Sequence, residues 1–532
     1  MSVKVLFIYP NTFGMNMLPP AIALFSSLLK ERGHKVDLFD ATYYQTNHGI
    51  NSDGTKAEHL NVMPFSLGEK GIKMRDADWR VDIVEKAQSF EPDLIALSTT
   101  EDMWLLGVRL LEQIGGYITR HKIPVIVGGV FPTFAPDLVI KHHLVDMVCV
   151  GEGENSLVDL CERLEKGNSY EDVTNLWIKQ KDGSIIKNPI SNPFDIDQTL
   201  MIDTDLFEEQ RFYRPMAGKW YKMMPVETIR GCPYKCSFCN SPDQMDFYKE
   251  TTSSNFFRKK KIDLVYRELK HFKENLGIEY FYFWADTFLS WSNSEFEEFC
   301  EMYSDIGLPF WMQTRPETLT DHKVKKLVDV GIRRISFGLE HGNEGFRKKM
   351  LSREWKNDAI IKALQIPRRY GVQFSVNNIT GFPTETRELA MDTVELNRHI
   401  DSDNQNMYSF VPFHGTPLRK TCEDMGLINP EDITLALTDK PSIQMEQYPE
   451  DQIEGLKKCF VLYVKMDRKH WKDIKRAEAD TPEGNRIFEE LKQECLENNM
   501  PRVKEIGDDE QPNTADLEYG LEVSGSGDLD DR

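Results

Sequence analysis

The chain has 532 residues, of which 40% are hydrophobic and 28% charged, which is globular composition in a chain too long for a single core. The net charge of −21 argues against a general nucleic-acid binder, which normally presents a basic face. No signal peptide begins the chain, no uncharged run reaches the length of a membrane span, and nine cysteines suit reduced thiols. We therefore expect a cytoplasmic protein without nucleic-acid or membrane partners.

Residues 1–170 alternate between apolar runs of strand length and amphipathic stretches of helical period. This alternation predicts an α/β fold with a doubly wound, Rossmann-like parallel sheet, in which ligands bind at the carboxyl ends of the strands. The strand-like runs are Val3–Tyr9, Val36–Phe39, Asp93–Ser98, Pro124–Val127 and Asp146–Val150.

Polar and glycine-rich loops follow these strands. Paired glycines let a backbone approach a flat or phosphorylated ligand closely, because no Cβ intervenes, although each loop alone is also explained as a tight turn. The candidate ligand contacts in these loops are Asn11, Thr12, Ser98, Thr99, Thr100, Gly128, Gly129, Val130, Phe131, Gly151, Glu152 and Gly153.

A hairpin and linker over residues 171–224 lead to a second strand–helix alternation over residues 225–420. Six strand-like segments are too few for a closed eight-stranded barrel and predict a partial six-strand β/α barrel. They are Val226–Ile229, Tyr280–Trp284, Pro309–Gln313, Arg334–Phe337, Gln373–Asn378 and Asn406–Val411.

Three cysteines in a C-x3-C-x2-C run, Cys232, Cys236 and Cys239, directly follow the first strand of this barrel. Thiolates at this spacing can hold an iron–sulfur cluster, and three of them leave one iron of a four-iron cluster open for chemistry. The alternative is a structural zinc site, which normally needs four ligands, often as two C-x2-C pairs. The other six cysteines are scattered singly, so the pattern favours a cluster.

Charged residues and glycines stand at the ends of other barrel strands, where active sites of such barrels gather. Asp286 and Glu340 offer carboxylates for an ammonium group or hydroxyls, and Arg315 offers a guanidinium for a carboxylate. Each of them taken singly is more often a solvated or helix-capping residue. Together with Gly338, they predict a site for a zwitterionic ligand that carries a ribose.

The last part of the chain has two segments. Residues 421–500 have helical periodicity and predict a helical C-terminal domain. Residues 501–532 contain ten acidic and three basic residues among Gly, Ser, Asn and Pro, which predicts a disordered acidic tail.

These motifs together resemble the radical S-adenosylmethionine (SAM) superfamily, in its branch with an N-terminal cobalamin-binding domain. The resemblance is carried by residues 232–239, Asp286, Gly338-Leu339-Glu340-His341-Gly342, Gly381-Phe382-Pro383 and Gly415-Thr416-Pro417.

The resemblance implies that the three cysteines bind a 4Fe-4S cluster whose open iron is chelated by SAM. Reduction by a donor such as flavodoxin or ferredoxin would yield a 5′-deoxyadenosyl radical. It further implies that Phe238 packs against the adenine, that Asp286 and Glu340 contact SAM, and that Arg315 does so with weaker support.

The cobalamin half departs from the better-known pattern. The loop after the first strand, residues 10–15, has no histidine where many such domains supply the lower cobalt ligand, and Phe131 stands where relatives often carry a histidine. Two interpretations remain: cobalamin bound without a protein ligand to cobalt, which we favour, or a domain that has lost cobalamin.

The resemblance implies an enzyme, and we expect a cobalamin-dependent methyltransferase acting on an unactivated carbon of a small molecule or biosynthetic intermediate. One alternative is a radical SAM oxidation, cyclisation or rearrangement without methyl transfer. The other is a non-enzymatic corrinoid- or metal-binding module.

Overall fold

The computed structural model describes residues 2–14, 17–46, 48, 52–62, 70, 72–216 and 218–500. The acidic tail expected over residues 501–532 lies outside the described residues. None of the described helices is long and apolar enough to cross a membrane.

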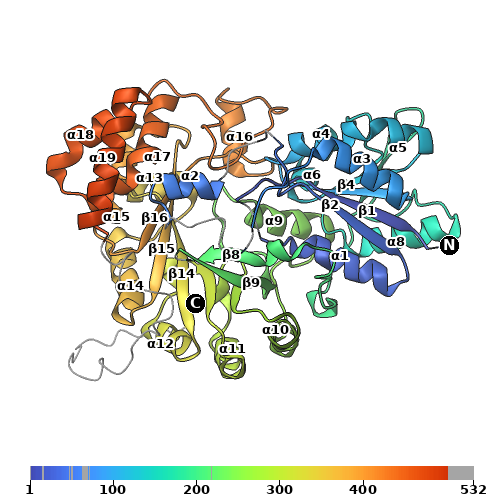
Figure 1. The fold of residues 1–532 in the computed structure, drawn as a ribbon, viewed down its shortest axis with the longest axis horizontal. Helices are drawn as coiled ribbons and strands as arrows, with labels where there is room; N and C mark the ends of the chain where they lie inside the picture. Colours follow the sequence, from blue (N-terminus) through green and yellow to red (C-terminus); the bar gives the residue numbers. More distant parts are fainter. Residues whose placement is uncertain are drawn as a thin grey trace.

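The N-terminal part folds around a seven-stranded sheet, seen at the right of Figure 1. Its strands are β1 (Lys4–Tyr9), β2 (Lys35–Asp40), β3 (Leu94–Ser98), β4 (Val125–Gly128), β5 (Met147–Cys149), β6 (Leu176–Lys179) and β7 (Ile185–Lys187). The order is β2-β1-β3-β4-β5-β6-β7, in which β1 to β5 are parallel and the hairpin β6–β7 is antiparallel. The doubly wound sheet expected from the sequence is confirmed.

Helices cover both faces of this sheet, because successive side chains of a buried parallel strand point to opposite sides. On β1, Val5 and Phe7 join one core, while Leu6 and Ile8 join another. The helices are α1 (Pro20–Glu31), α3 (Trp79–Phe90), α4 (Trp104–Gln113), α5 (Gly115–His121), α6 (Val130–Phe134), α7 (Pro136–Ile140) and α8 (Glu154–Lys166). Helices α1 and α8 cover the first face, and α3 to α5 the second.

Helix α2 (Ser52–Glu58) leaves this domain and lies beside the second half of the molecule (Figure 1). Leu60, just after it, is buried in the core of the C-terminal helices. The Asn61 amide donates to the backbone carbonyl of Gln405 at 2.9 Å. The two halves are therefore connected by the packing of the segment after α2 against the second half, as well as by the linker.

The second half is built on a curled seven-stranded sheet in the order β16-β15-β14-β13-β12-β9-β8. Its strands are β8 (Tyr213–Met216), β9 (Lys219–Glu227), β12 (Tyr280–Trp284), β13 (Phe310–Thr314), β14 (Ile332–Glu340), β15 (Gln373–Thr380) and β16 (Asn404–Ser409), with a small pair β10 (Ile229–Arg230) and β11 (Arg258–Lys259). The six parallel strands expected from the sequence are confirmed, and antiparallel β8 adds a seventh. Strand β9 begins at Lys219, earlier than predicted, because Lys219 and Lys222 interrupt the apolar pattern of its first half.

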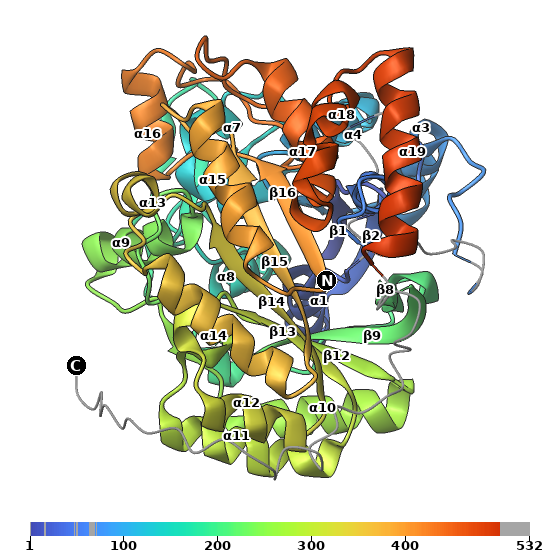
Figure 2. The same ribbon diagram turned by 90° about the vertical axis from the view of Figure 1, so that its left-hand side faces the viewer.

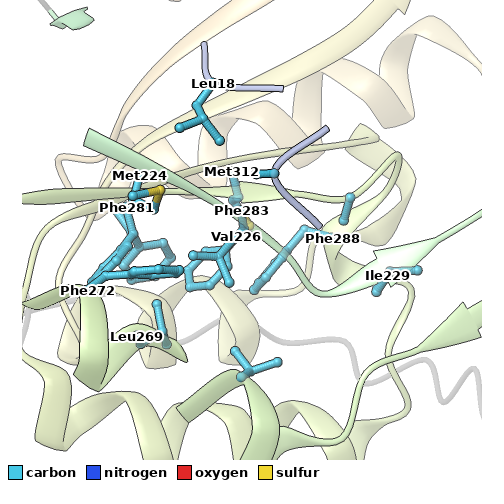
Figure 3. Packing of buried hydrophobic residues seen from close by; sticks show 14 of the residues in the cluster. Leu18, Met224, Val226, Ile229, Leu269, Phe272, Phe281, Phe283, Phe288 and Met312 are labelled. Atoms are coloured by element: carbon cyan, nitrogen blue, oxygen red, sulfur yellow. The ribbon is translucent and has the colours of Figure 1, made fainter. Parts of the chain in front are cut away.

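Helices cover the outer face of this partial barrel; Figure 2 shows α14 and α15 in front of β14 to β16. They are α9 (Asn240–Thr252), α10 (Ile262–Leu276), α11 (Asn293–Ile306), α12 (Asp321–Asp329), α13 (Glu344–Leu351), α14 (Asn357–Arg369) and α15 (Arg387–Arg398). Figure 3 shows the core between strands and helices, where Phe272 of α10 lies beside Phe281 of β12 and Met224 of β9. Short 3-10 turns lie at Ile196–Gln198, Glu209–Phe212, Phe288–Ser290, Pro316–Thr318 and Arg468–His470.

The C-terminal part is helical, as expected, with α16 (Pro417–Asp424), α17 (Glu450–Lys465), α18 (Trp471–Ala477) and α19 (Pro482–Asn498). Helix α17 is buried along most of its length between α15, β16 and the last two helices. This bundle closes the side of the barrel next to β16 (Figure 1).

Candidate active site

The three cysteines lie in the loop between β10 and α9, beyond the carboxyl end of β9. All three thiols are free and partly buried. Cys232 Sγ lies 3.5 Å from Thr287 Oγ1, and Arg315 donates from Nη1 to Cys236 Sγ at 3.5 Å. Burial raises the pKa of the Cys232 and Cys236 thiols above its ordinary value, so their deprotonation needs a cation.

Hydrogen bonds from three directions hold the cysteine loop. Ser237 Oγ donates to the carbonyl of Met350 at 2.5 Å, and the Ser237 carbonyl accepts from the N–H of Leu418 at 3.0 Å. Asn240 donates from Nδ2 to the carbonyl of His414 at 2.8 Å. The loop conformation is therefore fixed by α13 and by the segment that leads into α16.

The cysteine loop fits a cluster better than a single metal ion. Among the described residues, no three His, Cys, Asp or Glu side chains converge on one point as ligands of one ion. A four-iron cluster requires no such convergence, because each thiolate binds a different iron atom. Three free thiols on one braced loop supply three of the four iron positions and leave the fourth open.

A chain of ion pairs lies at the carboxyl ends of β13 and β14. Arg353 donates from Nη1 to Glu340 Oε1 at 2.9 Å and from Nη2 to the carbonyl of Gly338 at 3.0 Å. Arg315 pairs with Glu317 at 2.7 Å. Glu340 has a φ of +73° at an irregularity in the β14–β15 register, which turns the strand where its carboxylate is presented.

The two carboxylates of this chain have different electrostatic surroundings. Burial raises the pKa of Glu340, although Arg353 and Arg315 oppose it. Burial also tends to raise the pKa of Glu317, but Arg315 and Arg353 outweigh this effect, so the pKa of the Glu317 carboxyl is lowered. Glu317 therefore holds the two arginines, while Glu340 is left to bind a further cation or hydroxyl.

Asp286 follows β12 and faces the start of α9. Its carboxylate accepts a hydrogen bond from Ser241 Oγ at 2.5 Å, which ties it to the helix that begins just after Cys239. Burial raises the pKa of Asp286 above its ordinary value. The side chain thus lies next to the cysteine loop, as expected for a residue that would meet a ligand of the open iron.

Phe238 lies between the second and third cysteines, with its ring 6.3 Å from that of Phe382 in an edge-to-face arrangement. Phe382 belongs to the Gly381-Phe382-Pro383 segment after β15 and is fully buried. The structure therefore brings together Phe238, Asp286, Arg315, Gly338 and Glu340 around the cysteine loop. Their individual contacts with SAM stay predictions.

Sequence reasoning missed several residues of this site. Arg353 lies in the loop after α13, where no motif marks it. Ser241 and Glu317 look like ordinary helix-start residues in the sequence. Tyr234 could have been predicted, because it lies inside the cysteine run. The Arg315 guanidinium lies 3.8 Å from the centre of its ring.

A cavity of about 360 Å³ lies between the N-terminal sheet and the barrel. The loops after β3, β4 and β5 line one side of it through Ser98, Gly128, Gly129, Val130, Gly151, Glu152 and Gly153. The barrel side includes Pro225 and Val226 of β9, Tyr248 of α9 and Trp284 at the end of β12. Seven of the predicted loop residues therefore share one cavity.

Two glycines make this cavity possible. Gly129 has a φ of +124°, and a Cβ there would lie 2.3 Å from the carbonyl oxygen of Thr99. Gly151 has a φ of +90°, and a Cβ there would lie 2.7 Å from the Tyr248 hydroxyl. Bare backbone beside apolar side chains suits the flat face of a macrocycle such as the corrin ring of cobalamin.

The remaining predicted residues of the N-terminal domain do not line this cavity. Asn11 donates from Nδ2 to Thr42 Oγ1 at 2.9 Å, and Thr100 donates to Asp102 at 2.5 Å. Phe131 is buried and packs against Trp104. Thr12 and Thr99 are also buried. Their part in cofactor binding stays a prediction.

A buried ion-pair network connects the two domains beside the cysteine loop. Arg230 donates from Nη1 to Glu152 at 2.6 Å and to Glu154 at 2.7 Å, and its Nε pairs with Glu227 at 2.9 Å. Arg258 also pairs with Glu152 at 2.6 Å. Burial opposes ionisation of Glu152, but the two arginines outweigh it and lower its pKa. Glu152, predicted as a ligand contact, thus holds the domain interface.

A second buried connection joins the loop after β3 to the segment after β16. The Glu101 carboxylate accepts hydrogen bonds from the His414 N–H at 2.9 Å and the Thr434 N–H at 3.1 Å. His414 Nδ1 lies 2.8 Å from the same carboxylate. Burial of Glu101 opposes its ionisation, yet these contacts lower the pKa of its carboxyl. The interface between the two domains therefore has a buried charged group here as well as in the Arg230 network.

Two family models match the chain. The radical SAM superfamily matches residues 226–396, and the B12 binding domain matches residues 62–161. The chain contains a radical SAM domain. It carries a B12-binding domain ahead of the radical SAM domain, which confirms the resemblance and the cofactor set of 4Fe-4S cluster, SAM and cobalamin inferred from the sequence.

Similar proteins come from distant organisms. An uncharacterized methyltransferase of Pyrococcus horikoshii is 22% identical over 398 residues, which cover 74% of this chain and 83% of that protein. An anaerobic magnesium-protoporphyrin IX monomethyl ester cyclase of Rubrivivax gelatinosus is 23% identical over 427 residues, covering 77% and 68%.

Two solved structures show that the fold is shared. The methyltransferase TsrM of Kitasatospora setae, with cobalamin and a 4Fe-4S cluster bound, gives a TM-score of 0.60 at 16% identity, over 80% of this chain and 78% of that one. The cobalamin-dependent radical enzyme OxsB, with aqua-cobalamin and SAM bound, gives 0.64 at 15% identity, over 93% and 71%.

Proposed function

We propose that this radical SAM enzyme is a cobalamin-dependent methyltransferase that transfers a methyl group to a carbon of a small molecule. The observation that carries the proposal is the glycine-lined cavity beside the cysteine loop. The Glu152 N–H in its wall donates to the hydroxyl of Tyr248 at 2.7 Å, and Tyr248 lies on the helix that begins after Cys239. A corrinoid in this cavity and a cluster on the loop would lie on either side of one helix.

In this proposal Cys232, Cys236 and Cys239 hold the cluster, and Asp286 and Glu340 accept hydrogen bonds from the amine and ribose of SAM. When bound, the cluster and SAM supply a 5′-deoxyadenosyl radical, and cobalamin supplies a carrier for the methyl group. The protein orients the site, because Glu340 is held by Arg353 and Asp286 by Ser241 at the barrel mouth.

The proposal includes a one-electron donor of the flavodoxin or ferredoxin type. Lys235 supports it, because its side chain is 80% exposed within the cysteine run. A cation at this position favours approach of an acidic donor.

The names of two similar proteins bear on the choice of reaction. The relative from Pyrococcus horikoshii is named a methyltransferase, which favours methyl transfer, and the relative from Rubrivivax gelatinosus is named a cyclase, which favours the non-methylating alternative. The glycine-lined cavity is compatible with both methyl transfer and the non-methylating reaction. The two reactions must therefore be distinguished by their products.

The test is turnover of the anaerobically reconstituted protein with SAM, cobalamin and titanium(III) citrate. We expect 5′-deoxyadenosine together with S-adenosylhomocysteine. Formation of S-adenosylhomocysteine should depend on added cobalamin. Formation of 5′-deoxyadenosine alone would support the non-methylating reaction. A protein that holds its cluster but cleaves no SAM would contradict any radical function.

A further inference from the structure

A second cavity, of about 270 Å³, lies in the lumen of the barrel. Inward-facing side chains of β13 to β16 form its wall, and the β8–β9 hairpin and the end of the α2 segment form its rim. Its lining residues are Lys56, Asn61, Val62, Arg214, Pro215, Met216, Gly218, Trp311, Gln313, Arg334, Ser336, Ser375, Asn377, Asn404, Asn406 and Tyr408.

The charge of this lining is one-sided. Lys56, Arg214 and Arg334 contribute three cations, and no described Asp or Glu lines the cavity. The Lys56 ammonium lies 5.7 Å from the centre of the Tyr408 ring, and the Arg214 guanidinium lies 5.6 Å from that of Trp311. Within the described residues these cations meet aromatic faces in the cavity wall, so the cavity has a positive potential that attracts an anion.

Arg334 is the most deeply placed of these cations, with 8% of its surface exposed. Its guanidinium donates to Asn404 Oδ1 at 2.9 Å and to Gln373 Oε1 at 2.6 Å, and both partners are neutral amides. Its Nε is buried without a hydrogen-bond partner among the described residues. A buried charge without a counter-charge is costly, and an anionic group in the cavity would remove that cost.

Two amides next to Arg334 have further unused hydrogen-bonding capacity. Asn404 Nδ2 and Asn406 Oδ1 are buried without partners among the described residues. These side chains are 6% and 7% exposed, and Asn406 is oriented by a 2.8 Å hydrogen bond from its Nδ2 to Asn377 Oδ1. One free donor and one free acceptor match a hydroxyl or an amide on a ligand.

The cavity lies directly below the proposed SAM site. Ser336 in its wall is two residues before Gly338 on the same face of β14, and Gln313 is two residues before Arg315. Two residues of a strand span about 7 Å, so a molecule in the lumen lies within reach of a radical formed at the strand ends. The location is one where a substrate hydrogen could be abstracted.

We propose that the lumen cavity binds the substrate, a small polar molecule whose carboxylate or phosphate lies against Arg334 and Arg214 and whose hydroxyl or amide meets Asn404 and Asn406. This inference rests on the proposed function, because it takes the barrel mouth as the place where the radical forms. Carboxylate and phosphate share the anionic oxygens that a guanidinium binds in bidentate fashion.

The test is equilibrium dialysis of the cluster-reconstituted full chain with saturating SAM, which fills the Arg315 region. The probes are labelled inorganic phosphate, labelled succinate and, as a neutral polar probe, labelled glycerol. We expect about one equivalent of one anion per chain, and about tenfold weaker binding in Arg334→Gln and in Arg214→Gln. Arg214 lies on the edge strand β8, and its side chain contacts Trp311 through a cation–π interaction rather than a buried hydrogen bond, so its variant keeps the test independent of folding.

Arg333→Gln is the matched control, because it removes the same charge from the neighbouring residue of β14, which does not line the cavity. It should change anion binding less than twofold. Phosphate binding without succinate binding would indicate a phosphorylated substrate, and the reverse a carboxylic acid. No anion binding, or binding insensitive to both Arg334→Gln and Arg214→Gln, would overturn the inference.

The radical generator is measured separately, as 5′-deoxyadenosine formed from SAM under strong reductant. SAM cleavage by a protein that binds no anion would overturn the lumen proposal and leave the proposed function standing. Anion binding by a protein that cannot cleave SAM would overturn the proposed function and leave an anion site in the lumen standing.

Discussion

The mouth of the barrel and the cavity of the N-terminal domain are built on different principles. At the mouth, buried charges meet in pairs, and Arg315, Glu317, Arg353 and Glu340 form a continuous chain. The N-terminal cavity instead depends on bare backbone at Gly129 and Gly151 and on apolar walls. In the proposed function, recognition of SAM at the first site would rest on residue chemistry, while recognition of cobalamin at the second would rest on shape. Substitutions that remove a charge should therefore damage the first, and substitutions that add a carbon should damage the second.

The largest effect is expected for Cys236→Ala. Loss of one of three thiolates should prevent stable cluster binding and reduce formation of 5′-deoxyadenosine to the background rate. Iron content, visible absorbance and product formation measure this. Cys300→Ala is the control, because Cys300 is buried on α11 and should cost only about 1–2 kcal/mol of stability while the cluster is kept. Equal cluster loss in both variants would remove the cysteine loop from the mechanism.

Arg353→Gln tests whether charge governs the barrel mouth. The change leaves Glu340 without its ion-pair partner, while Glu317 keeps Arg315, and truncating one partner of a buried pair costs about 2–5 kcal/mol. We expect the Kd for SAM, measured by dialysis, to rise about 30-fold or more, with the cluster still present. Lys348→Gln on α13 removes an exposed cation, 64% accessible, and should have no measurable effect. Unchanged SAM affinity in Arg353→Gln would show that Arg353 serves packing alone.

Gly129→Ala tests the part that shape plays. Its Cβ would lie 2.3 Å from a backbone oxygen at a positive φ, so the loop must move, at a cost of about 1–3 kcal/mol in strain. We expect cobalamin binding to weaken about tenfold or more while the cluster content is retained. At Gly128 the nearest atom to an added Cβ is 3.6 Å away, an ordinary contact, so Gly128→Ala should bind cobalamin nearly as the native protein does. Equal corrinoid content in the two variants would contradict the cavity assignment.

The smallest effect concerns Asp243 on α9, between the two sites. Burial, with a contribution from Asp246, raises the pKa of this carboxyl from 3.8 to about 7. The folded protein therefore holds the proton more tightly than the unfolded chain, and this stabilisation is lost as pH rises from about 4 to about 7. Asp243→Asn stays neutral, so its Tm relative to the native protein should increase by roughly 1–2 °C between pH 5 and pH 8. A pH-independent difference in Tm would show that Asp243 is ionised throughout.

The contrast between the two sites also explains what the sequence could predict. The sequence could single out Cys232, Cys236, Cys239, Asp286 and Glu340 as candidates because the expected chemistry needs those residue types at strand ends. The structure indeed groups them, and the parallel sheets and partial barrel agree with the periodicity of the chain.

The rest depends on spatial placement. Arg353 reaches Glu340 from a loop 13 residues further on, and no local pattern marks it. In the N-terminal loops the backbone conformation decides which side chain faces the cavity, so Val130 lines it while its neighbour Phe131 packs inward. The early start of β9 was missed because Lys219 and Lys222 interrupt the apolar pattern of its first half.

Arg230 has a consequence for how the two cofactors are loaded. It lies two residues before Cys232 and holds Glu152 and Glu154 of the B12-binding domain. In the proposed function, a shift of the cysteine loop on cluster insertion would also change the affinity of the N-terminal cavity for cobalamin through Arg230, and thermodynamic reciprocity would make the effect equal in the other direction. The affinity for either cofactor is then a property of the holoenzyme, and a half-loaded protein is a different binding partner for the second cofactor.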